Sequence, residues 1–401
     1  MRPLFGSLAI AATALPALGG PKSAIEPIVT EEHNNGSFCD WLSGSPGELY
    51  KNKENPFISK VKIFGRAHYQ AVYVDGDEGS ELIQDFRRLR SGAQVDFLKF
   101  FTAKATVNLV DDDRQAGDDL GFGYESFEDA TLKFEFGKAF GLDFFDDAEL
   151  VYGKQKVEIG HEQHLSSKKI KTIERSAMAN FVRPANSTGT LLFLEKGDWA
   201  GSFAYYSADE ENELSGDYDQ SYYYASITRG FGDDSLTLDY IKSDNNGEGE
   251  GIDYDWASAA SYNIERDMWS LAIDTYYGEK GDAADGDRGG NFYGVTVLPT
   301  YWIVQDRLEL VGRYAFQGSN EDEGVRVGSR YTRDPGNSSD TNGVGSNGRG
   351  DAHHAVYLGL NYYLCGDNAK FLFGVEYDTI STDNEGQQSA LTYGGAFRMF
   401  F

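Results

Sequence analysis

The final thirteen residues of the chain, Ser389–Phe401, alternate between two kinds of side chain. Successive residues of a β-strand point to opposite faces, so one face of this segment is apolar and the other is small or polar up to Arg398. The apolar face carries Leu391, Tyr393, Phe397, Met399 and Phe401. The segment is therefore predicted to be a strand with one apolar face. That face either covers the core of a soluble sandwich or meets lipid, and the rest of the chain must decide between the two.

The start of the chain predicts export. Arg2 gives a short basic beginning, an apolar and alanine-rich run covers 4–15, and small residues follow up to Gly19. This is the pattern of a secretory signal peptide, which we place at residues 1–19. No other stretch approaches the ~20 consecutive apolar residues of a membrane-spanning helix. We therefore expect an exported protein without a transmembrane helix.

Segments with a two-residue period recur along the remaining chain. In the first of them, Val61 and Ile63 share one predicted face, while Lys62 and Arg66 share the other. A polar face that recurs in many strands would be wasteful in a sandwich core but suits a water-filled lumen. One segment contains Pro299, which has no N–H for a ladder, so we expect a bulge or a shifted boundary there. The candidate strands are 58–74, 82–97, 100–110, 128–137, 147–160, 188–195, 199–208, 221–230, 235–243, 257–266, 268–279, 291–304, 307–318, 352–365, 369–381 and 388–401.

The links between these segments alternate between short and long. Short links such as 98–99 and 305–306 alternate with long ones such as 160–188 and 319–350. That alternation is typical of an up-and-down barrel with short periplasmic turns and long external loops. The composition agrees, because 47 Gly, 25 Tyr and 26 Phe residues with only 9 Pro and 4 Met favour strands and turns over helices.

We therefore predict an all-β fold, a transmembrane antiparallel up-and-down β-barrel of about sixteen strands in the bacterial outer membrane. The barrel would cover residues 58–401, after a periplasmic N-terminal segment at 20–57. Closure would place the last strand between the strands at 369–381 and 58–74. The apolar face of the last strand would then meet lipid, and Arg398 would face the lumen.

The two cysteines, Cys39 and Cys365, predict one disulfide. The chain is predicted to be exported, it has an even number of cysteines, and neither cysteine belongs to a redox or zinc motif. Cys39 lies about twenty residues before the first strand, and Cys365 lies at the base of the fourteenth. Both positions are periplasmic in the predicted barrel, and twenty residues reach up to ~60–70 Å. The pair would fasten the N-terminal segment under the barrel. The alternative is two unrelated thiols.

Two basic segments stand out in a chain whose formal net charge is -28. That net charge argues against nucleic acid as a partner. One basic segment is 85–92 (DFRRLRSG), in which strand phase groups Arg88 with Arg90 on one face. The other is 153–176 (GKQKVEIGHEQHLSSKKIKTIERS), which is basic in both its strand and its loop part. Its cations are Lys154, Lys156, Lys168, Lys169, Lys171 and Arg175.

In their order, the segment FRRLRSGAQ, the Gly-Lys-x-Lys strand and the Ser-Ser…Ile-Glu-Arg-Ser loop resemble the phosphate-selective porin O and P family. The resemblance implies a sixteen-stranded barrel that forms homotrimers. It also implies that the loop after the fifth strand, here near 160–188, folds inward and narrows the pore. The terminal phenylalanine, Phe401, would be an assembly signal.

By the same resemblance, the six cations of the second segment would line or frame an anion-preferring constriction, with Arg88 and Arg90 on the neighbouring wall. Acidic external loops would not prevent this, because the Debye length is ~8 Å at physiological ionic strength and local cations set the selectivity. In the alternative interpretation, these cations pair with carboxylates across the barrel wall, or face solvent or lipid headgroups.

Other chemistry has weaker signals. Acidic runs such as 111–119 and 244–255 could hold Ca²⁺ through oxygens, but none matches the twelve-residue calcium loop, so we expect no metal and no cofactor. The pair His353–His354 has no nucleophile motif near it, so we do not expect an enzyme. His161 and His164 lie in the basic loop, where they could change its charge as the pH falls.

We therefore predict an outer-membrane porin, a passive diffusion channel for small hydrophilic solutes that prefers phosphate-like anions. Its partners would be outer-membrane lipid or lipopolysaccharide, the permeating anions and two further copies of the chain. Two alternatives stay open. One is a non-channel structural or adhesive barrel that binds through 319–350, and the other is a barrel hydrolase that uses His353 or His354.

Overall fold

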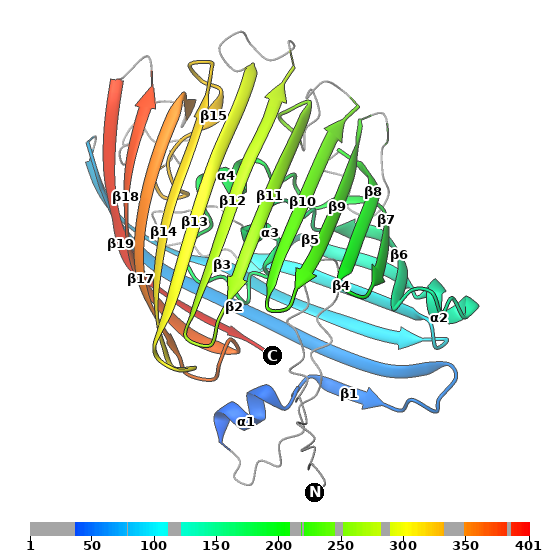
Figure 1. Cartoon of the computed structure of the whole chain (residues 1–401). Helices are drawn as coiled ribbons and strands as arrows, with labels where there is room; N and C mark the ends of the chain where they lie inside the picture. The colour runs from blue at the N-terminus through cyan, green and yellow to red at the C-terminus, as the bar shows by residue number, and fades with distance from the viewer. Residues whose placement is uncertain are drawn as a thin grey trace, which may run out of the picture.

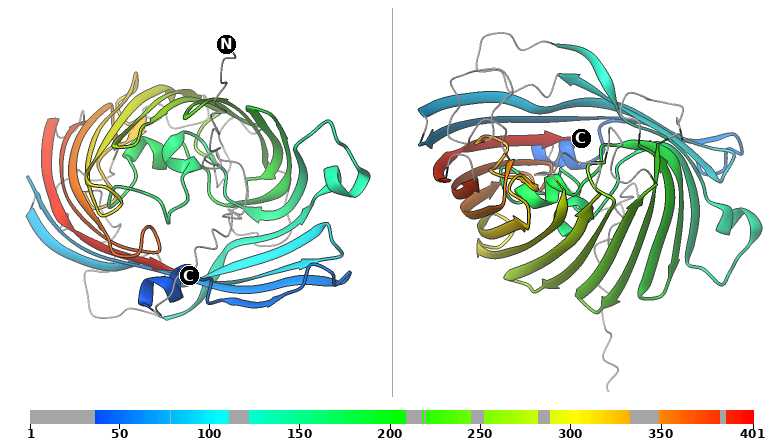
Figure 2. Two further views of the ribbon diagram at one scale, coloured as in Figure 1. Left: turned by 60° about the horizontal axis from the view of Figure 1, so that its bottom comes forward. Right: turned by 90° about the horizontal axis from the view of Figure 1, so that it is seen from above.

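The computed structural model shows a β-barrel with two long loops inside it (Figures 1 and 2). It describes residues 37–77, 79–110, 122–208, 218, 220–244, 252–281, 289–332, 349–382 and 386–401. The predicted signal peptide at 1–19 and residues 20–36 of the predicted periplasmic segment lie outside these ranges. In the described part of the chain, no helix combines the length and the apolarity needed to span a bilayer.

The main sheet has seventeen strands, of which β1 (Glu48–Lys51) pairs with the start of β2 and the other sixteen close into a barrel. All pairings in the wall are antiparallel, and each wall strand pairs with the next wall strand along the chain, which confirms the predicted up-and-down topology. The wall strands are β2 (Ile58–Gly76), β3 (Gly79–Phe97), β4 (Phe101–Val110), β5 (Phe122–Phe134), β6 (Asp147–Gln155), β7 (Ser187–Lys196), β8 (Trp199–Ser207), β9 (Ser221–Phe231), β10 (Asp234–Ser243), β11 (Trp256–Glu265), β12 (Trp269–Lys280), β13 (Gly290–Val304), β14 (Leu308–Ser319), β17 (Ala352–Tyr363), β18 (Ala369–Thr382) and β19 (Gly386–Phe400).

The last strand closes the barrel. β19 pairs with β18 on one side and with β2 on the other, where the register runs from Ala390↔Gly76 to Phe400↔Arg66. The predicted neighbours of this strand are therefore confirmed. Leu391 and Tyr393 are exposed on its outer face, and Arg398 is buried on its inner face.

The end of β19 differs from the prediction. Met399 and Phe401 do not face lipid, because both pack against a small cluster that includes Leu42 of α1 (Phe38–Ser43). The ring of Phe401 lies over Gly65 of β2, where a Cβ atom would come within 2.6 Å of it. Only glycine leaves room for this contact.

A disulfide joins Cys39 of α1 to Cys365, the pair that the sequence predicts, with a Cα–Cα distance of 5.1 Å. The helix begins with a capping box in which the side chains of Ser37 and Asp40 bond to each other's backbone N–H groups. Its apolar side chain Leu42 is 1% exposed beside Cys365. The N-terminal segment is thus fastened beside the β18–β19 end of the wall.

Pro299 does not cause the bulge or shifted boundary that we expected. It pairs in register with Leu271 of β12. Toward β14, the pairs Val297↔Tyr314 and Thr300↔Val311 keep one register past it, and the irregularity comes later, between Trp302 and Val304. The strand therefore accommodates a proline inside a closed wall.

The fifth wall strand is shorter than predicted. β6 ends at Gln155, whereas the alternation of the sequence extends to about residue 160. Gly153 has a φ of 123°, a conformation that favours glycine, and a Cβ there would come within 2.0 Å of the Ala130 carbonyl oxygen. The backbone thus leaves regular strand geometry at Gly153. The following segment, 156–186, crosses into the barrel.

The inner face of the wall carries an aromatic patch. On β7–β9, inward side chains such as Phe193, Tyr206 and Tyr222 are aromatic and fully covered. They form one core with Ile159 and Met178 of segment 156–186. The expectation of polar inner faces is therefore wrong at these positions, because a loop rather than water covers them, while β10 and β12 keep inward polar side chains such as Asp239 and Asp274.

Candidate functional site

Segment 156–186, the loop after the fifth wall strand, lies inside the barrel (Figure 2). We call it the inner loop. It contains the short helices α3 (His161–His164) and α4 (Ala177–Phe181). Because its apolar side chains join the core described above, the inner loop is held against the β7–β12 side of the wall.

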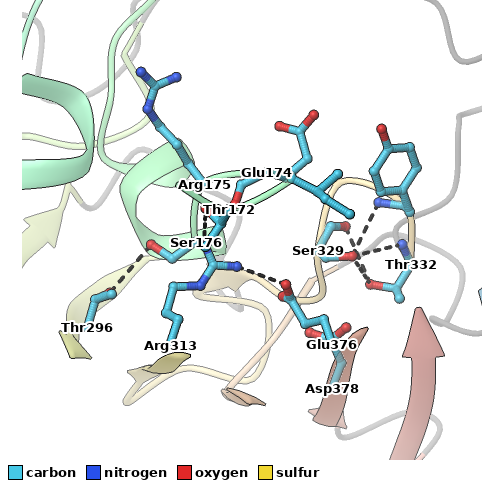
Figure 3. Close-up of polar contacts among 12 residues, drawn as sticks. Thr172, Glu174, Arg175, Ser176, Thr296, Arg313, Ser329, Thr332, Glu376 and Asp378 are labelled. Carbon is cyan, nitrogen blue, oxygen red and sulfur yellow. Dashed lines mark hydrogen bonds and ion pairs between the residues drawn. The ribbon is translucent and has the colours of Figure 1, made fainter. Parts of the chain in front are cut away.

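Arg313 of β14 is the central polar anchor of the inner loop (Figure 3). Its guanidinium donates to Glu162 at 3.1 Å, to Glu376 of β18 at 2.8 Å and to the carbonyl oxygen of Glu174 at 2.7 Å. The side chains of Arg313 and Glu162 are 1% and 2% exposed. Glu162 also accepts the backbone N–H of Ser176 at 3.0 Å, and Ser176 caps α4. One buried guanidinium thus joins two strands to two points of the inner loop.

Lys171 forms a second anchor. Its ammonium group lies 2.8 Å from Glu309, whose side chain is fully buried, and 3.1 Å from the hydroxyl of Thr300. Asn361 donates to the carbonyl oxygen of Lys171 at 2.8 Å, and Tyr363 donates to Glu309 at 2.6 Å. Lys171 is therefore held against the β13–β17 side of the wall.

His164 forms a third anchor. Its Nε2 lies 3.0 Å from both carboxylate oxygens of Asp239, and its Nδ1 lies 3.3 Å from Glu158. Burial opposes the imidazolium, but the two carboxylates outweigh it and raise the pKa of His164 to about 10. Burial lowers the pKa of His161 to about 3. Between pH 5 and 8 the first imidazole is thus charged and the second neutral, so neither changes the charge of the loop there as the pH falls.

This anchor predicts a stability that depends on alkaline pH. The pKa of His164 is raised above its ordinary value of 6.5, so the imidazolium stabilises the folded state. This stability is fully present below about pH 6.5 and is lost as the pH rises through about 10. We expect wild type to exceed His164→Gln by a few kcal/mol in free energy of unfolding at pH 7. Urea titrations in lipid vesicles at pH 7, 9 and 11 should show this difference shrinking. A difference that persists at pH 11 would contradict a charged anchor.

Opposite the anchored side, five basic side chains meet on three adjacent strands. Strand pairing places Arg398 beside His68, and His68 beside Arg88. One step along, Arg66 pairs with Arg90. We call this set the basic row, which consists of Arg66, His68, Arg88, Arg90 and Arg398.

Most of the basic row is covered by the inner loop. His68, Arg88 and Arg398 are at most 6% exposed. Arg66 donates to the hydroxyl of Ser167, and Arg398 donates to the carbonyl oxygen of Ile173. The loop therefore lies against the row through short polar contacts.

Several donors of the basic row have no partner. Within the described ranges, no hydrogen bond satisfies Nη1 of Arg88, Nε of Arg66, or Nε and Nη1 of Arg398, although all four atoms are buried. Arg90 differs, because it lies 2.6 Å from Glu128 and 2.7 Å from the side-chain oxygen of Asn108. Buried donors without a partner are costly unless a ligand or water accepts from them. An anion is the ligand that would satisfy several guanidinium groups at once.

Glu174 supplies a fixed negative charge near the row. It accepts from Arg87 at 2.9 Å and from Gln70 at 2.8 Å. Burial opposes the carboxylate, but Arg87 and Arg330 outweigh it and hold the pKa of Glu174 well below its ordinary value.

A second loop also folds inward. In residues 319–332, Tyr331 accepts a hydrogen bond from Gln70 of β2, and Arg330 lies 3.4 Å from Asp85 of β3. Figure 3 shows its turn, in which the hydroxyl of Ser329 accepts from the backbone N–H groups of Tyr331 and Thr332. Residues 330 and 331 thus contact inward side chains of β2 and β3, whereas the adhesive alternative needs an external binding element. Residues 333–348 lie outside the described ranges.

The structure separates the predicted site residues by their contacts. Lys171 is an anchor, and Lys156 and Arg175 bond carbonyl oxygens within the inner loop, including that of Leu165. Lys168 lies 4.3 Å from the ring of Phe400. Lys169 is exposed, and within the described residues its side chain makes no hydrogen bond or ion pair.

Lys154 does not join the basic row. It follows Tyr152, which is exposed on the outer face of β6, but the turn of the backbone at Gly153 breaks the alternation. The register places Lys154 between Ala130 and Thr188. It is buried there, and its strand β6 lies three strands from β3, which carries Arg88.

Sequence reasoning missed the full basic row and the Arg313 anchor. Strand phase alone puts Arg66 and Arg398 on inner faces, but only the pairing of the last strand with the first brings them together. Arg313 and Glu376 lie on two strands separated by β17. The residues next to them in the sequence do not indicate that the two side chains meet.

The two adjacent histidines do not form one site. His353 points inward and lies 2.6 Å from Asp378 and 3.2 Å from Gln317, while His354 is on the outer face beside Tyr314. In the part of the chain that the structure describes, no three His, Cys, Asp or Glu side chains are grouped as metal ligands.

Comparisons with known proteins agree with this architecture. The family model "Phosphate-selective porin O and P" matches residues 61–295. No curated protein matches the chain. OmpT of Vibrio cholerae, folded in vitro, is similar with a TM-score of 0.52 at 12% identity, covering 88% of this chain and 99% of that one.

Two further solved structures share the fold. The trimer form of the same OmpT has a TM-score of 0.50 at 13% identity, with 85% of this chain and 99% of that one covered. OprB of Pseudomonas putida has a TM-score of 0.51 at 10% identity, with 84% and 94% covered. At these identities the likeness shows the barrel fold.

Proposed function

Because the chain belongs to the phosphate-selective porin O and P family, we propose that it forms an outer-membrane channel that prefers small, phosphate-like anions. The observation that carries the anion preference is the set of buried, unpartnered guanidinium donors of Arg66, Arg88 and Arg398 within the described residues. Permeation is passive diffusion through the lumen, and the positive charge that these groups keep favours an anion there.

The electrostatics of the basic row support this preference. The basic row has four arginines on β19, β2 and β3. One of them, Arg90, pairs with the carboxylate of Glu128. The guanidinium fork matches phosphate-like oxygens geometrically. Acidic groups several Debye lengths away are screened, whereas a cation within a few ångströms of the ion is not.

The predicted cations divide into two roles under this proposal. Lys169 and the basic row act on the permeating ion. Lys171, Arg175 and Lys156 act on the loop, because protein oxygens already occupy their charges. A change of charge at Lys169 therefore affects selectivity, while a change at Lys171 affects the seating of the loop.

Reversal potentials in asymmetric KCl across planar bilayers test both the preference and this division. Wild type should prefer chloride over potassium. Lys169→Glu changes two unit charges in a wet lumen, each worth about 0.5 kcal/mol at ~8 Å and a dielectric constant of ~80, so the anion-to-cation permeability ratio should fall about fivefold. Its folding should match wild type.

Lys171→Gln serves as the matched comparison. It should leave the permeability ratio within about twofold of wild type but lower the free energy of unfolding by about 3 kcal/mol or more, because the buried Glu309 loses its cation. Cation preference in the wild type would refute the proposed function. A selectivity change at Lys171→Gln without loss of stability would refute the division of roles.

We further propose that the channel is a homotrimer whose subunits meet through β2–β5. The solved trimer form of OmpT supports the assembly. The outer faces of β2–β4 carry small side chains, which allow close approach of another wall, whereas the outer faces of β8–β19 are rich in exposed aromatic residues suited to lipid or lipopolysaccharide. The small side chains on the first face are Ala67, Ala71, Ala93, Ala103 and Ala105.

A further inference from the structure

Arg229 is an arginine on the outer, lipid-facing side of the barrel. In β9 the exposed residues alternate, and Tyr223, Ile227 and Phe231 are each 41–46% exposed on the same face as Arg229. β9 runs from a long external link to the short turn at 232–233, so Arg229 lies near the periplasmic end of the wall. A charged side chain on a lipid-facing surface is costly at the bilayer centre and tolerated near the interface.

Two aromatic rings hold the guanidinium in place. Its carbon lies 5.0 Å from the ring centre of Trp199 on β8 and 4.7 Å from that of Phe231. Both rings are nearly half exposed, so they belong to the aromatic belt that sits at the level of the lipid headgroups. Cation–π contact orders the side chain but does not neutralise its charge.

The charge of Arg229 has no protein counterion in the described part of the chain, where no carboxylate or other acceptor bonds its guanidinium. Arg266 provides the contrast at the same end of the barrel. It lies 5.9 Å from the ring of Trp269, but it also donates to both carboxylate oxygens of Asp234, at 2.5 and 3.2 Å. Two arginines thus share the belt, and only one of them is neutralised by the protein.

We propose that Arg229, between Trp199 and Phe231, binds the phosphate group of an anionic phospholipid in the periplasmic leaflet. The phosphodiester is the acceptor available at this depth, and the planar guanidinium can donate two parallel hydrogen bonds to it. The site is independent of the anion preference proposed above, because it lies on the other face of the wall. A carboxylate from a second copy is the competing source of the counterion, but β9 lies four strands beyond the proposed subunit contact at β2–β5.

Native mass spectrometry of the full-length, folded protein in mild detergent tests this site. Wild-type protein should retain more phosphatidylglycerol than phosphatidylcholine when each lipid is titrated into it. The reason is that the choline group partly neutralises the phosphate. One interfacial arginine contributes about 1 kcal/mol, so Arg229→Gln should lower the apparent affinity for phosphatidylglycerol about fivefold. Arg229→Lys should lose less, and Arg266→Gln should bind like wild type.

Three outcomes would overturn the proposal. They are an absence of lipid preference in wild type, an equal loss in Arg266→Gln, and a change of oligomeric state in Arg229→Gln, which would assign the counterion to a second copy. The first of these needs no variant, so the test survives if a variant folds poorly. Reversal potentials should be the same for Arg229→Gln and wild type, which separates this site from the channel.

Discussion

Replacing Arg313 by methionine should destabilise the folded barrel by about 3–5 kcal/mol and release the inner loop from the wall. The reason is that Glu162 and Glu376 would remain buried without their common cation, and the carbonyl oxygen of Glu174 would lose its donor. A loop that loses its central anchor no longer holds one position in the lumen. Urea unfolding in vesicles should show the loss of stability, and single-channel traces should show larger and noisier conductance.

A compensated variant makes this prediction sharper. Arg313→Met combined with Glu162→Gln and Glu376→Gln removes the buried charges together, so it should regain much of the lost stability. Arg307→Met is the matched control, because Arg307 is an exposed arginine in the turn before β14. Its free energy of unfolding should stay within about 0.5 kcal/mol of wild type. If Arg313→Met were as stable as this control, the anchor would not hold the loop.

Arg88→Glu should convert the channel from anion to cation preference. The substitution changes two unit charges in the basic row, between the covered wall and the water of the lumen, where an effective dielectric constant of ~40 gives about 1 kcal/mol per charge at ~8 Å. The anion-to-cation permeability ratio should therefore fall about thirtyfold. The barrel should still fold, since the new carboxylate would lie beside Arg66, Arg90 and Arg398. Reversal potentials in KCl gradients measure this change.

Two controls isolate the effect of position. Lys196→Glu makes the same change of charge at the periplasmic end of β7, outside the lumen, and should leave the reversal potential unchanged. Arg88→Gln should have about half of the effect of Arg88→Glu on the logarithm of the permeability ratio. Equal reversal potentials for wild type and Arg88→Glu would remove the basic row from the permeation path.

The contrast between Arg313 and Arg88 explains why a count of cations is a poor guide to selectivity. Both are buried arginines on inner faces. The charge of Arg313 is balanced within the protein by two carboxylates, whereas Arg88 has a buried donor without a partner in the described chain. Selectivity therefore depends on which cations the protein leaves unpaired.

The wall of the barrel could be predicted from sequence because its rules are local. Each of the sixteen candidate strands corresponds to a wall strand, since alternation and turn residues act over a few positions. Errors occur where a distant contact overrides the local pattern. Met399 and Phe401 pack against α1 instead of lipid, and part of the inner face of β7–β9 is aromatic because the inner loop covers it.

The candidate site could be predicted only in part. Arg88 and Arg90 stand out as a dense basic segment, and Lys169 proves to be an exposed cation of the inner loop. Lys171, Lys156 and Arg175 belong to the same segment, but their charges are occupied by Glu309 and by backbone oxygens. Charge pairing between residues more than a hundred positions apart leaves no trace in the spacing of either partner.

By itself, the sequence determined the class of fold, the order of the strands, the pairing of the last strand with the first and the pair of cysteines that could meet. These follow from two-residue alternation, loop length and chain reach, which are properties of neighbours along the chain. The tertiary structure alone decided which cations are anchors and which keep donors for an anion. That distinction depends on closure of the barrel, which brings Arg398, His68 and Arg88 together and places Glu162 and Glu376 on either side of Arg313.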